Sequence, residues 1–212
     1  MPRVGLLGGT FDPVHNGHLA LARTARRYCS LDEIWLLPAA LPPHKTGEPL
    51  TSFAHRARMI ELALADEPTL HLSEIEATLP RPSYTIDTLT CLQNQQAQPA
   101  DYFFIIGADA FLEIRTWKAY HQVLAAVDWI VCGRGPLIRE QLRELAHELG
   151  YQDQGDDLLD PVSRKQIFLP SQVLPDISSS QIRQRLVEGL PVANLLPSPV
   201  LGYLHEHHLY GC

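Results

Sequence analysis

Short apolar runs alternate with segments of helical periodicity along most of the chain, and this alternation limits the possible folds more than any other feature. The runs are rich in Ile, Val, Leu and aromatic residues, and several end at Gly or Pro, which is typical of buried strands. They predict strands at residues 3–7, 33–38, 69–76, 101–107, 128–133 and 166–170, with helices at 17–29, 52–65, 85–96 and 138–150. Such alternation predicts an α/β fold with a mostly parallel, doubly wound sheet and helices on both faces.

The chain shows no internal repeat and no long linker, so we expect one domain over residues 1–212 with this Rossmann-like architecture. A length of 212 residues is enough for one α/β domain with a hydrophobic core. The least regular segment, residues 151–164, is polar and acidic, and we predict a surface loop there. Ligands of such sheets bind beyond the carboxyl ends of the strands, so the residues that follow each strand are the candidates for chemistry.

Composition excludes several classes of protein. The 17 basic and 24 acidic residues give a net charge of −7, which argues against a general nucleic-acid binder because nonspecific affinity comes mainly from clustered Lys and Arg. The four cysteines are far apart and form no CxxC pair, which excludes a zinc ribbon or a disulfide scaffold and fits a reducing compartment. We find no signal peptide and no apolar run of membrane-spanning length, so we expect a soluble cytoplasmic protein without a membrane partner.

The sequence GGTFDPVHNGH at residues 8–18 follows the first predicted strand and has the features of a phosphate site. Gly8 and Gly9 allow the backbone to approach a ligand closely, and a helix that begins near Gly17 presents unpaired N–H groups to an anion. His15 and His18 are three residues apart, so they share a face if the helix has begun. Because the stretch has neither GxxxxGK[ST] nor GxGxxG, imidazoles and backbone groups would hold the phosphate.

Two other interpretations of this stretch stay open. A glycine-rich turn with two surface histidines is the ordinary one. A zinc site is the second, because histidines at this spacing can share a metal ion, although Asp12 is the only carboxylate nearby and a third ligand is not evident.

A second candidate anion site lies late in the chain, in the sequence LPDISSSQIRQRLVEG. Helix capping explains one of the three serines and the stop at Gly189. It does not explain Arg183, which we place in the first turn, where positive charge opposes the helix dipole. A bound anion would resolve that conflict, and Ser179, Ser180 and Arg183 would then converge on it.

Both stretches resemble signatures of the nucleotidyltransferase superfamily: GGTFDPVHNGH resembles its (H/T)xGH motif, and ISSSQIR resembles its ISSTxxR-type motif. In that superfamily the histidines contact the triphosphate of ATP and stabilise the transition state of adenylyl transfer. The resemblance implies that His15, His18 and Arg183 are catalytic. It also implies an ATP and phosphate site formed by Gly8, Gly9, Thr10, Phe11, Lys45, Ser179 and Ser180.

Further stretches resemble the bacterial nicotinate-nucleotide adenylyltransferases: LLPAALPPHK, RPSYTIDTL, FIIGADAF, TWKAY and LLPSPVLGYLHEHHLY, so that the likeness extends from Gly8 to Tyr210. It implies that ATP and nicotinate mononucleotide are the substrates, and that nicotinate adenine dinucleotide and pyrophosphate form, as in NAD biosynthesis. Mg²⁺ would bind mainly through the ATP phosphates, with no dedicated protein ligand. The mononucleotide site would include Thr85, Asp109, Trp117 and Arg134.

Each of these residues also has an ordinary structural explanation. Trp117 could belong to the core, Thr85 could cap the helix that it begins, and Asp109 could be a helix N-cap after Gly107. Lys45 could be a solvated loop charge and Arg134 a turn residue. The chain also departs from the family, because Lys118 stands where an aromatic or other large residue is common, and CGRGP is looser than the Arg-Pro-Gly pattern common at that point.

Alternative functions remain at this point. A related enzyme could use nicotinamide mononucleotide, phosphopantetheine or, with CTP, an alcohol phosphate as the acceptor. A nucleotide sensor without catalysis is a second alternative, and a tRNA-linked synthetase fragment, which the short acidic chain disfavours, is a third. His205, His207 and His208 are best explained as polar surface residues of a terminal helix. An oligomer is possible, and the sequence does not decide it.

Overall fold

One sheet organises the molecule, which we describe from a computed structural model over residues 1–42, 50–94, 99–133, 135–172 and 174–212. Within these ranges the sheet has eight strands in the order β3-β2-β1-β4-β5-β8-β7-β6. The strands are β1 (Arg3–Gly9), β2 (Glu33–Pro38), β3 (Leu70–Leu72), β4 (Asp101–Gly107), β5 (Asp128–Cys132), β6 (Gln152–Gln154), β7 (Asp157–Leu159) and β8 (Gln166–Phe168).

The strands from β3 to β8 in this order are parallel, and the chain winds outward in both directions from β1. β1 pairs with β2 on one side and with β4 on the other, and the direction of winding reverses between β1 and β4. In a doubly wound sheet, ligands bind at the carboxyl ends of the strands beside such a reversal. The predicted fold class, a mostly parallel doubly wound α/β sheet, is therefore confirmed.

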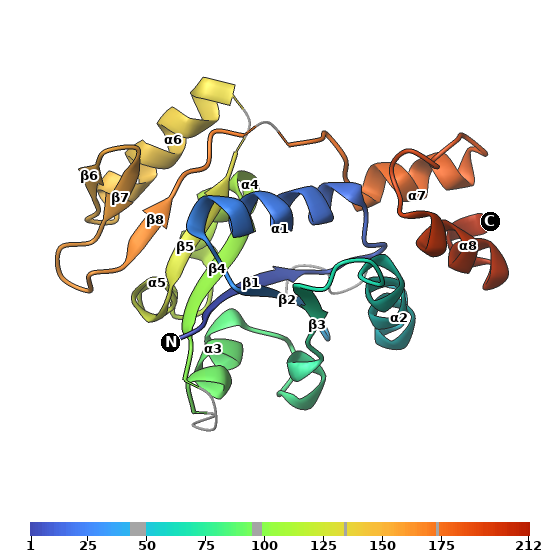
Figure 1. Cartoon of the computed structure of the whole chain (residues 1–212), viewed down its shortest axis with the longest axis horizontal. Coiled ribbons are helices and arrows are strands. Elements are labelled where there is room, and N and C mark those ends of the chain that lie inside the picture. The colour runs from blue at the N-terminus through green and yellow to red at the C-terminus, as the bar shows by residue number, and fades with distance from the viewer. Residues whose placement is uncertain (43–49, 95–98, 134, 173) are drawn as a thin grey trace.

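Helices cover both faces of the sheet (Figure 1). Alternate residues of each central strand point to opposite faces, so that Leu7 and Ile105 join one core cluster while Leu6 and Phe104 join the other. The first cluster is covered by α1 (Asn16–Cys29), α2 (Phe53–Ala63), α7 (Ser179–Val187) and α8 (Ser198–Glu206), and the second by α3 (Thr85–Asn94), α4 (Ala108–Leu112), α5 (Tyr120–Ala126) and α6 (Gly135–Glu148). Of the helices in the described ranges, none is long and apolar enough to cross a membrane.

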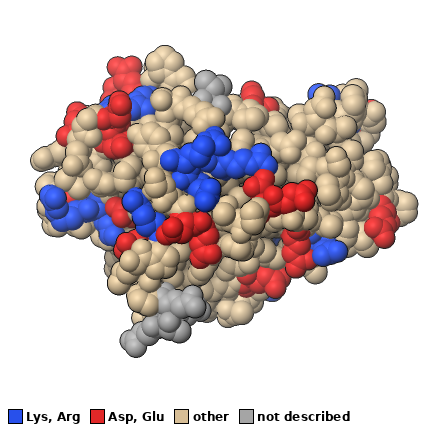
Figure 2. Space-filling view, viewed as in Figure 1, with Lys and Arg blue, Asp and Glu red and all other residues tan. Residues whose placement is uncertain are grey.

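Charges of both signs share the face of the molecule that Figure 2 shows. The basic side chains near the middle of this view lie over α1, which carries Arg23, Arg26 and Arg27. Acidic side chains lie beside them, and Glu67 forms an ion pair with Arg23. This face is therefore not uniformly basic.

Several predicted boundaries shift. The predicted strand at residues 69–76 is strand only at Leu70–Leu72, and Ile75–Thr78 forms a 3-10 turn. The predicted helix at 52–65 begins as expected, because Ser52 Oγ accepts a hydrogen bond from the His55 N–H at 3.3 Å. The start of α2 was predictable because the capping residue is its neighbour in the sequence. The length of β3 was not, because it depends on the strand that pairs with it.

The prediction of a surface loop at residues 151–164 is wrong. β6 and β7 form an antiparallel hairpin there, and β7 extends the sheet by pairing antiparallel with β8. Leu158 on β7 is fully buried and lies opposite Ile167 on β8. The hairpin forms because the sheet edge offers unpaired backbone groups, which an acidic composition does not reveal.

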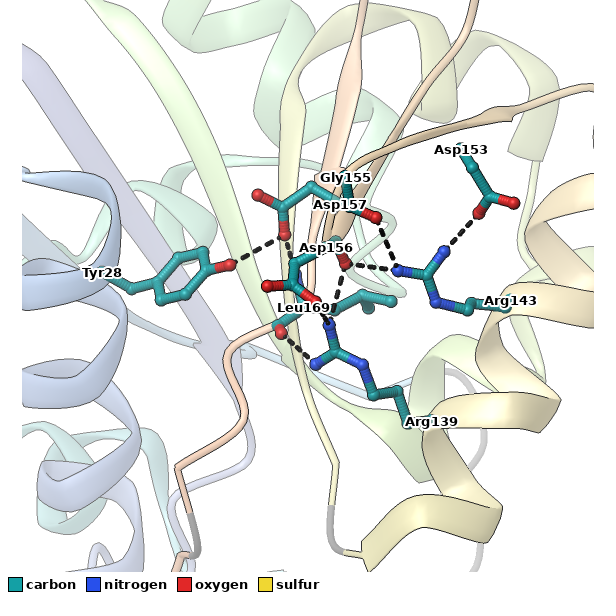
Figure 3. Close-up of polar contacts among 8 residues, drawn as sticks. All are labelled: Tyr28, Arg139, Arg143, Asp153, Gly155, Asp156, Asp157 and Leu169. Carbon is teal, nitrogen blue, oxygen red and sulfur yellow. Dashed lines mark hydrogen bonds and ion pairs between the residues drawn. The ribbon is translucent and has the colours of Figure 1, made fainter.

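Side chains from two helices hold this hairpin in place (Figure 3). Arg143 on α6 forms an ion pair with Asp153 and donates to the Asp156 carbonyl at 2.7 Å. Tyr28 on α1 donates to Asp157 Oδ1 at 3.0 Å, and the same oxygen accepts the Leu169 N–H at 2.8 Å. The polar residues that suggested a loop are therefore the partners of distant helices.

Candidate active site

A cavity of about 730 Å³ opens at the carboxyl ends of β1, β4 and β5, beside the reversal of the sheet. It lies between the start of α1, the start of α4 and the segment that leads into α7. Eight of the residues predicted from the sequence line it: Gly8, Thr10, Phe11, His15, His18, Asp109, Ser179 and Ser180. The segments that carry them are far apart in the chain, and the sheet brings them together.

His15 and His18 stack against each other at the start of α1. Their ring centroids are 3.7 Å apart with 27° between the planes. The helix begins at Asn16, so His15 is its N-cap and His18 lies in the first turn. Gly17 makes room for this arrangement, because a Cβ there would come within 2.9 Å of His15 Nδ1. The His15 N–H donates to His18 Nδ1 at 3.2 Å, so neutral His18 carries its proton on Nε2.

Burial keeps both imidazoles neutral. The side chain of His15 is buried, and desolvation lowers its pKa to about 4. Burial also lowers the pKa of His18 well below its usual value, and the neighbouring His15 lowers it further. At neutral pH the pair therefore meets an arriving ligand as N–H donors rather than as cations, and a bound anion would favour protonation.

Arg56 fixes the loops that follow β1 and β2. Its guanidinium is fully buried and donates to three carbonyl oxygens: Thr10 at 2.8 Å, Thr51 at 3.0 Å and Ala40 at 3.5 Å. Burial lowers the pKa of Arg56, and the negative charge of Asp12 opposes that shift. Arg56 was not among the predicted site residues. A signal for it was present in the sequence, because Arg56 precedes Ile60 and Ala63 at helical spacing on the apolar face of α2.

Residues of α7 reach the loop that carries the histidines. Arg183 Nη1 donates to the Asp12 carbonyl at 2.7 Å, and Ser179 Oγ donates to the Pro13 carbonyl at 2.9 Å. Arg183 also lies 3.4 Å from Ser180 Oγ. Only Ser178 acts as the N-cap, while Ser179 bonds the loop beyond its helix and Ser180 lies beside Arg183 on the same helix.

The placement of Arg183 in the first helical turn is wrong. α7 begins at Ser179, so Arg183 is its fifth residue and the conflict with the helix dipole is weaker than the sequence suggested. Its guanidinium is instead directed by the Asp12 carbonyl.

Trp117 and Thr85 lie at a second location, apart from the described lining of the cavity. Trp117 follows the 3-10 turn Ile114–Thr116 and packs edge-on against Trp129 and Phe104, at centroid distances of 6.3 and 6.2 Å. It thus belongs partly to the core. Phe104 connects the two locations, because a Cβ at Gly8 would lie 3.0 Å from its ring.

Lys118 joins Trp117 to the start of α3, whose first residue is Thr85. Its ammonium lies 3.0 Å from Asp87 Oδ2 and 4.5 Å from the centre of the Tyr84 ring. Lys118, which departs from the family pattern, therefore pairs with Asp87 and Tyr84 of the same protein.

Four more of the predicted site residues are Asp109, Gly9, Lys45 and Arg134. Asp109 lines the cavity as the second residue of α4, but the N-cap is Gly107, so the capping explanation for Asp109 is wrong. Gly9 ends β1, where its carbonyl accepts the Ala39 N–H at 2.9 Å. Lys45 and Arg134 lie outside the described residues.

No group of three or more His, Cys, Asp or Glu side chains is placed to hold a metal ion within the described ranges. The Asp12 carboxylate is buried and accepts the Tyr210 hydroxyl. Among the terminal histidines, His207 stacks near Tyr203, whose hydroxyl lies 2.9 Å from His55 Nδ1. Asp109 and Asp176 are the acidic residues in the described lining of the cavity.

Leu174, Pro175, Asp176 and Ile177 form a further wall of the cavity. They begin the stretch LPDISSSQIRQRLVEG, but none of them was predicted as a site residue. These residues follow β8, the last parallel strand, and lead into α7. The rule that ligands bind after parallel strands could have identified all four, whereas the motif ISSSQIR includes only Ile177.

Comparison with known proteins gives consistent matches over the whole chain. A model of the cytidylyltransferase-like family matches residues 6–185. A protein of Desulfotalea psychrophila named "Probable nicotinate-nucleotide adenylyltransferase" is 40% identical, over 99% of this chain and 100% of its own length. A protein of Symbiobacterium thermophilum with the same name is 38% identical, over 99% and 96%. The structure of Plasmodium falciparum nicotinic acid mononucleotide adenylyltransferase complexed with NaAD has the same fold, with a TM-score of 0.75 at 18% identity over 99% of this chain and 98% of that one.

Proposed function

The chain belongs to the cytidylyltransferase-like family, and on that premise we propose that it transfers the adenylyl group of ATP to nicotinate mononucleotide. The products are nicotinate adenine dinucleotide and pyrophosphate, as in NAD biosynthesis. One observation carries the proposal: the stacked pair His15 and His18 lines the same cavity as Ser179 and Ser180, which come from the other signature. The full-length relatives named for this reaction support the choice of acceptor.

The reaction needs no nucleophile from the protein. The 5′-phosphate of the mononucleotide is ionised near neutral pH, and it attacks the α-phosphorus of ATP in line while pyrophosphate leaves. Catalysis then depends on holding the two substrates in position and on stabilising the charge that develops on the phosphates. This requirement fits a cavity lined by N–H donors and hydroxyl groups.

His15, His18 and Arg183 stabilise that charge. The imidazole of His18 is oriented by the His15 N–H, so its Nε2–H is fixed as a donor before ATP arrives. Donors oriented in advance cost little reorganisation during the reaction. Arg183 is held at the Asp12 carbonyl, beside the loop on which the histidines depend.

The triphosphate is held by the loop after β1 and the start of α7. Gly8, Gly9, Thr10 and Phe11 supply the backbone, while Ser179 and Ser180 supply hydroxyl groups. The N–H groups at the start of α7 favour an anion in the same place. Lys45 contributes a cation to the phosphates and remains a prediction outside the described residues.

The mononucleotide binds across the second location and reaches Asp109 in the cavity. Trp117 stacks on the pyridine ring, the start of α3 at Thr85 meets its carboxylate, and Asp109 bonds a ribose hydroxyl. The ammonium of Lys118 is paired with Asp87, which supports backbone recognition of the carboxylate rather than recognition by that cation. Arg134 remains a prediction for this site, outside the described residues.

Mg²⁺ would accompany ATP and would be held mainly by the ATP phosphates. The described residues lack a cluster that could cage a metal ion, and Asp109 and Asp176 are the carboxylates of the cavity. This donor set fits an ion that keeps most of its water and is held by substrate phosphates. When bound, the ion would neutralise phosphate charge.

The whole chain, residues 1–212, acts as a single nucleotidyltransferase domain in the cytoplasm. Its partners are its two substrates, with no nucleic acid and no membrane. The mixed charge of the face in Figure 2 and the net charge of −7 support the first exclusion. The oligomeric state can be measured by light scattering on the purified protein.

The test is an acceptor comparison with purified protein, ATP and Mg²⁺. Nicotinate mononucleotide, nicotinamide mononucleotide and phosphopantetheine are supplied in separate reactions, and pyrophosphate release and product mass are measured. We expect kcat/KM to be highest for nicotinate mononucleotide, with a product of the mass of nicotinate adenine dinucleotide. Preference for either other acceptor would assign a related transferase, and ATP binding without turnover would assign a nucleotide sensor.

A further inference from the structure

The signature loop, residues 8–18, is held from behind by a residue near the carboxyl terminus. Tyr210 lies in the 3-10 turn Leu209–Gly211, and its hydroxyl donates to Asp12 Oδ1. The Asp12 side chain is only 2% exposed. The two residues are 198 positions apart. No sequence motif predicted this contact, and the reaction proposed above does not use it.

The loop needs such support because its backbone is strained. Phe11 has a φ of 52°, in the left-handed region that non-glycine residues seldom adopt. Strained conformations persist only where surrounding contacts enforce them. The ring of Phe11 is buried, and its centroid lies 4.8 Å from that of His18. A relaxation of Phe11 would therefore disturb the imidazole that is proposed to contact ATP.

Contacts on both sides of Phe11 enforce its conformation. On one side, Arg56 Nη1 donates to the Thr10 carbonyl at 2.8 Å. On the other side, Asp12 is bound twice, through its carbonyl by Arg183 and through its carboxylate by Tyr210. Among the described residues, Tyr210 alone makes a hydrogen bond to the Asp12 side chain.

The surroundings suit Tyr210 as a permanent donor. Burial raises the pKa of its phenol, and the neighbouring Asp12 raises it further, so the hydroxyl keeps its proton throughout the physiological range. The nearby Thr51 side chain partly opposes this shift, and the Thr51 carbonyl accepts from Arg56 Nε at 3.0 Å. Thr51 therefore lies near both Arg56 and Tyr210.

We propose that Tyr210 is a positioning residue for adenylyl transfer: through Asp12 it holds Phe11 in its strained conformation and so keeps the His18 ring in place. This inference rests on the proposed function for its kinetic consequence. The contact itself does not depend on which acceptor the enzyme uses.

The chain offers a matched control in Tyr203. Its hydroxyl also makes a hydrogen bond between the carboxyl-terminal segment and another helix, because it lies 2.9 Å from His55 Nδ1 on α2. Within the described residues, Tyr203 is not among those that line the cavity, and its hydroxyl bonds His55 rather than the signature loop. Tyr210→Phe and Tyr203→Phe thus each remove one hydroxyl from the same segment, but only the first releases Asp12.

The experiment measures pyrophosphate release, with ATP and nicotinate mononucleotide each varied at a saturating concentration of the other, and the melting temperature of each protein. Because one hydrogen bond to a charged group is lost, we expect Tyr210→Phe to lower kcat by about tenfold while KM for the mononucleotide is unchanged. Tyr203→Phe should keep the kcat of the unmodified enzyme. An equal fall in both variants, or an undiminished kcat in Tyr210→Phe, would overturn the proposal.

A second readout is independent of turnover. Imidazole titrations followed by NMR report the pKa of His18 in each variant. In Tyr210→Phe the loosened loop should raise this pKa toward 6.5, and in Tyr203→Phe it should not change. If the unmodified protein transfers to no acceptor, the proposed function fails, yet this titration still decides the role of Tyr210. An unchanged His18 titration in Tyr210→Phe would overturn it.

Discussion

The buried imidazole of His15 should make the stability of this protein depend on pH in a defined window. Burial lowers its pKa to about 4 in the folded protein, against 6.5 for an exposed histidine. Between these values the unfolded chain binds more protons than the folded one, so the free energy of unfolding falls as the pH falls. The stabilisation is fully present above pH 6.5 and is lost by the time the pH has dropped through the folded pKa.

The size of this effect follows from the pKa shift. The difference of the two pKa values corresponds to about 3 kcal/mol, which acid removes between pH 7 and pH 4 or below. His15 is 5% exposed, so solvent screening reduces this figure little. Glutamine does not titrate. Between pH 7 and pH 4 we therefore expect the free energy of unfolding of His15→Gln to fall by about 3 kcal/mol less than that of the unmodified protein.

Urea unfolding followed by tryptophan fluorescence measures the free energy of unfolding of the unmodified protein and of the variant at each pH. Comparing two proteins across the same pH change cancels the carboxylates that titrate in both. His121→Gln is the control, since His121 is exposed on α5 and its removal leaves the buried pair intact. The explanation is wrong if the free energy of unfolding falls as far in His15→Gln as in the unmodified protein between pH 7 and pH 4. It is also wrong if His121→Gln reduces that fall as much as His15→Gln does.

Three further substitutions test other parts of the site. His18→Ala should lower kcat by about 100-fold with the fold retained, as for other removed transition-state donors; a folded variant with normal kcat would exclude His18 from the mechanism. Trp117→Ala should raise KM for nicotinate mononucleotide by about tenfold, the value of one stacking contact, and leave KM for ATP nearly unchanged; parallel changes in both constants would contradict stacking. Arg56→Lys should lower the free energy of unfolding by about 2 kcal/mol in urea, because buried carbonyls lose their donors; a change below about 0.5 kcal/mol would show that the carbonyls find other partners.

Local patterns predicted the parts of the fold that depend on neighbouring residues in the chain. The run at 101–107 became β4 with the predicted bounds, and Ser52 capped α2 as expected. The hairpin β6–β7 was missed because its strands are stabilised by β8 and by Arg143 from α6. Such partners lie at sequence distances that a local pattern does not cover.

The candidate site likewise combines features that the sequence predicted with features that only the folded chain has. The two signature motifs by themselves marked His15, His18, Ser179 and Ser180, because phosphate chemistry requires particular residue types at particular spacings. Only the tertiary structure stacked the imidazoles, and it also decided which groups support them from behind. Burial depends on what packs around a group, so the lowered pKa of His15 and the contact between Tyr210 and Asp12 exist only in the folded chain.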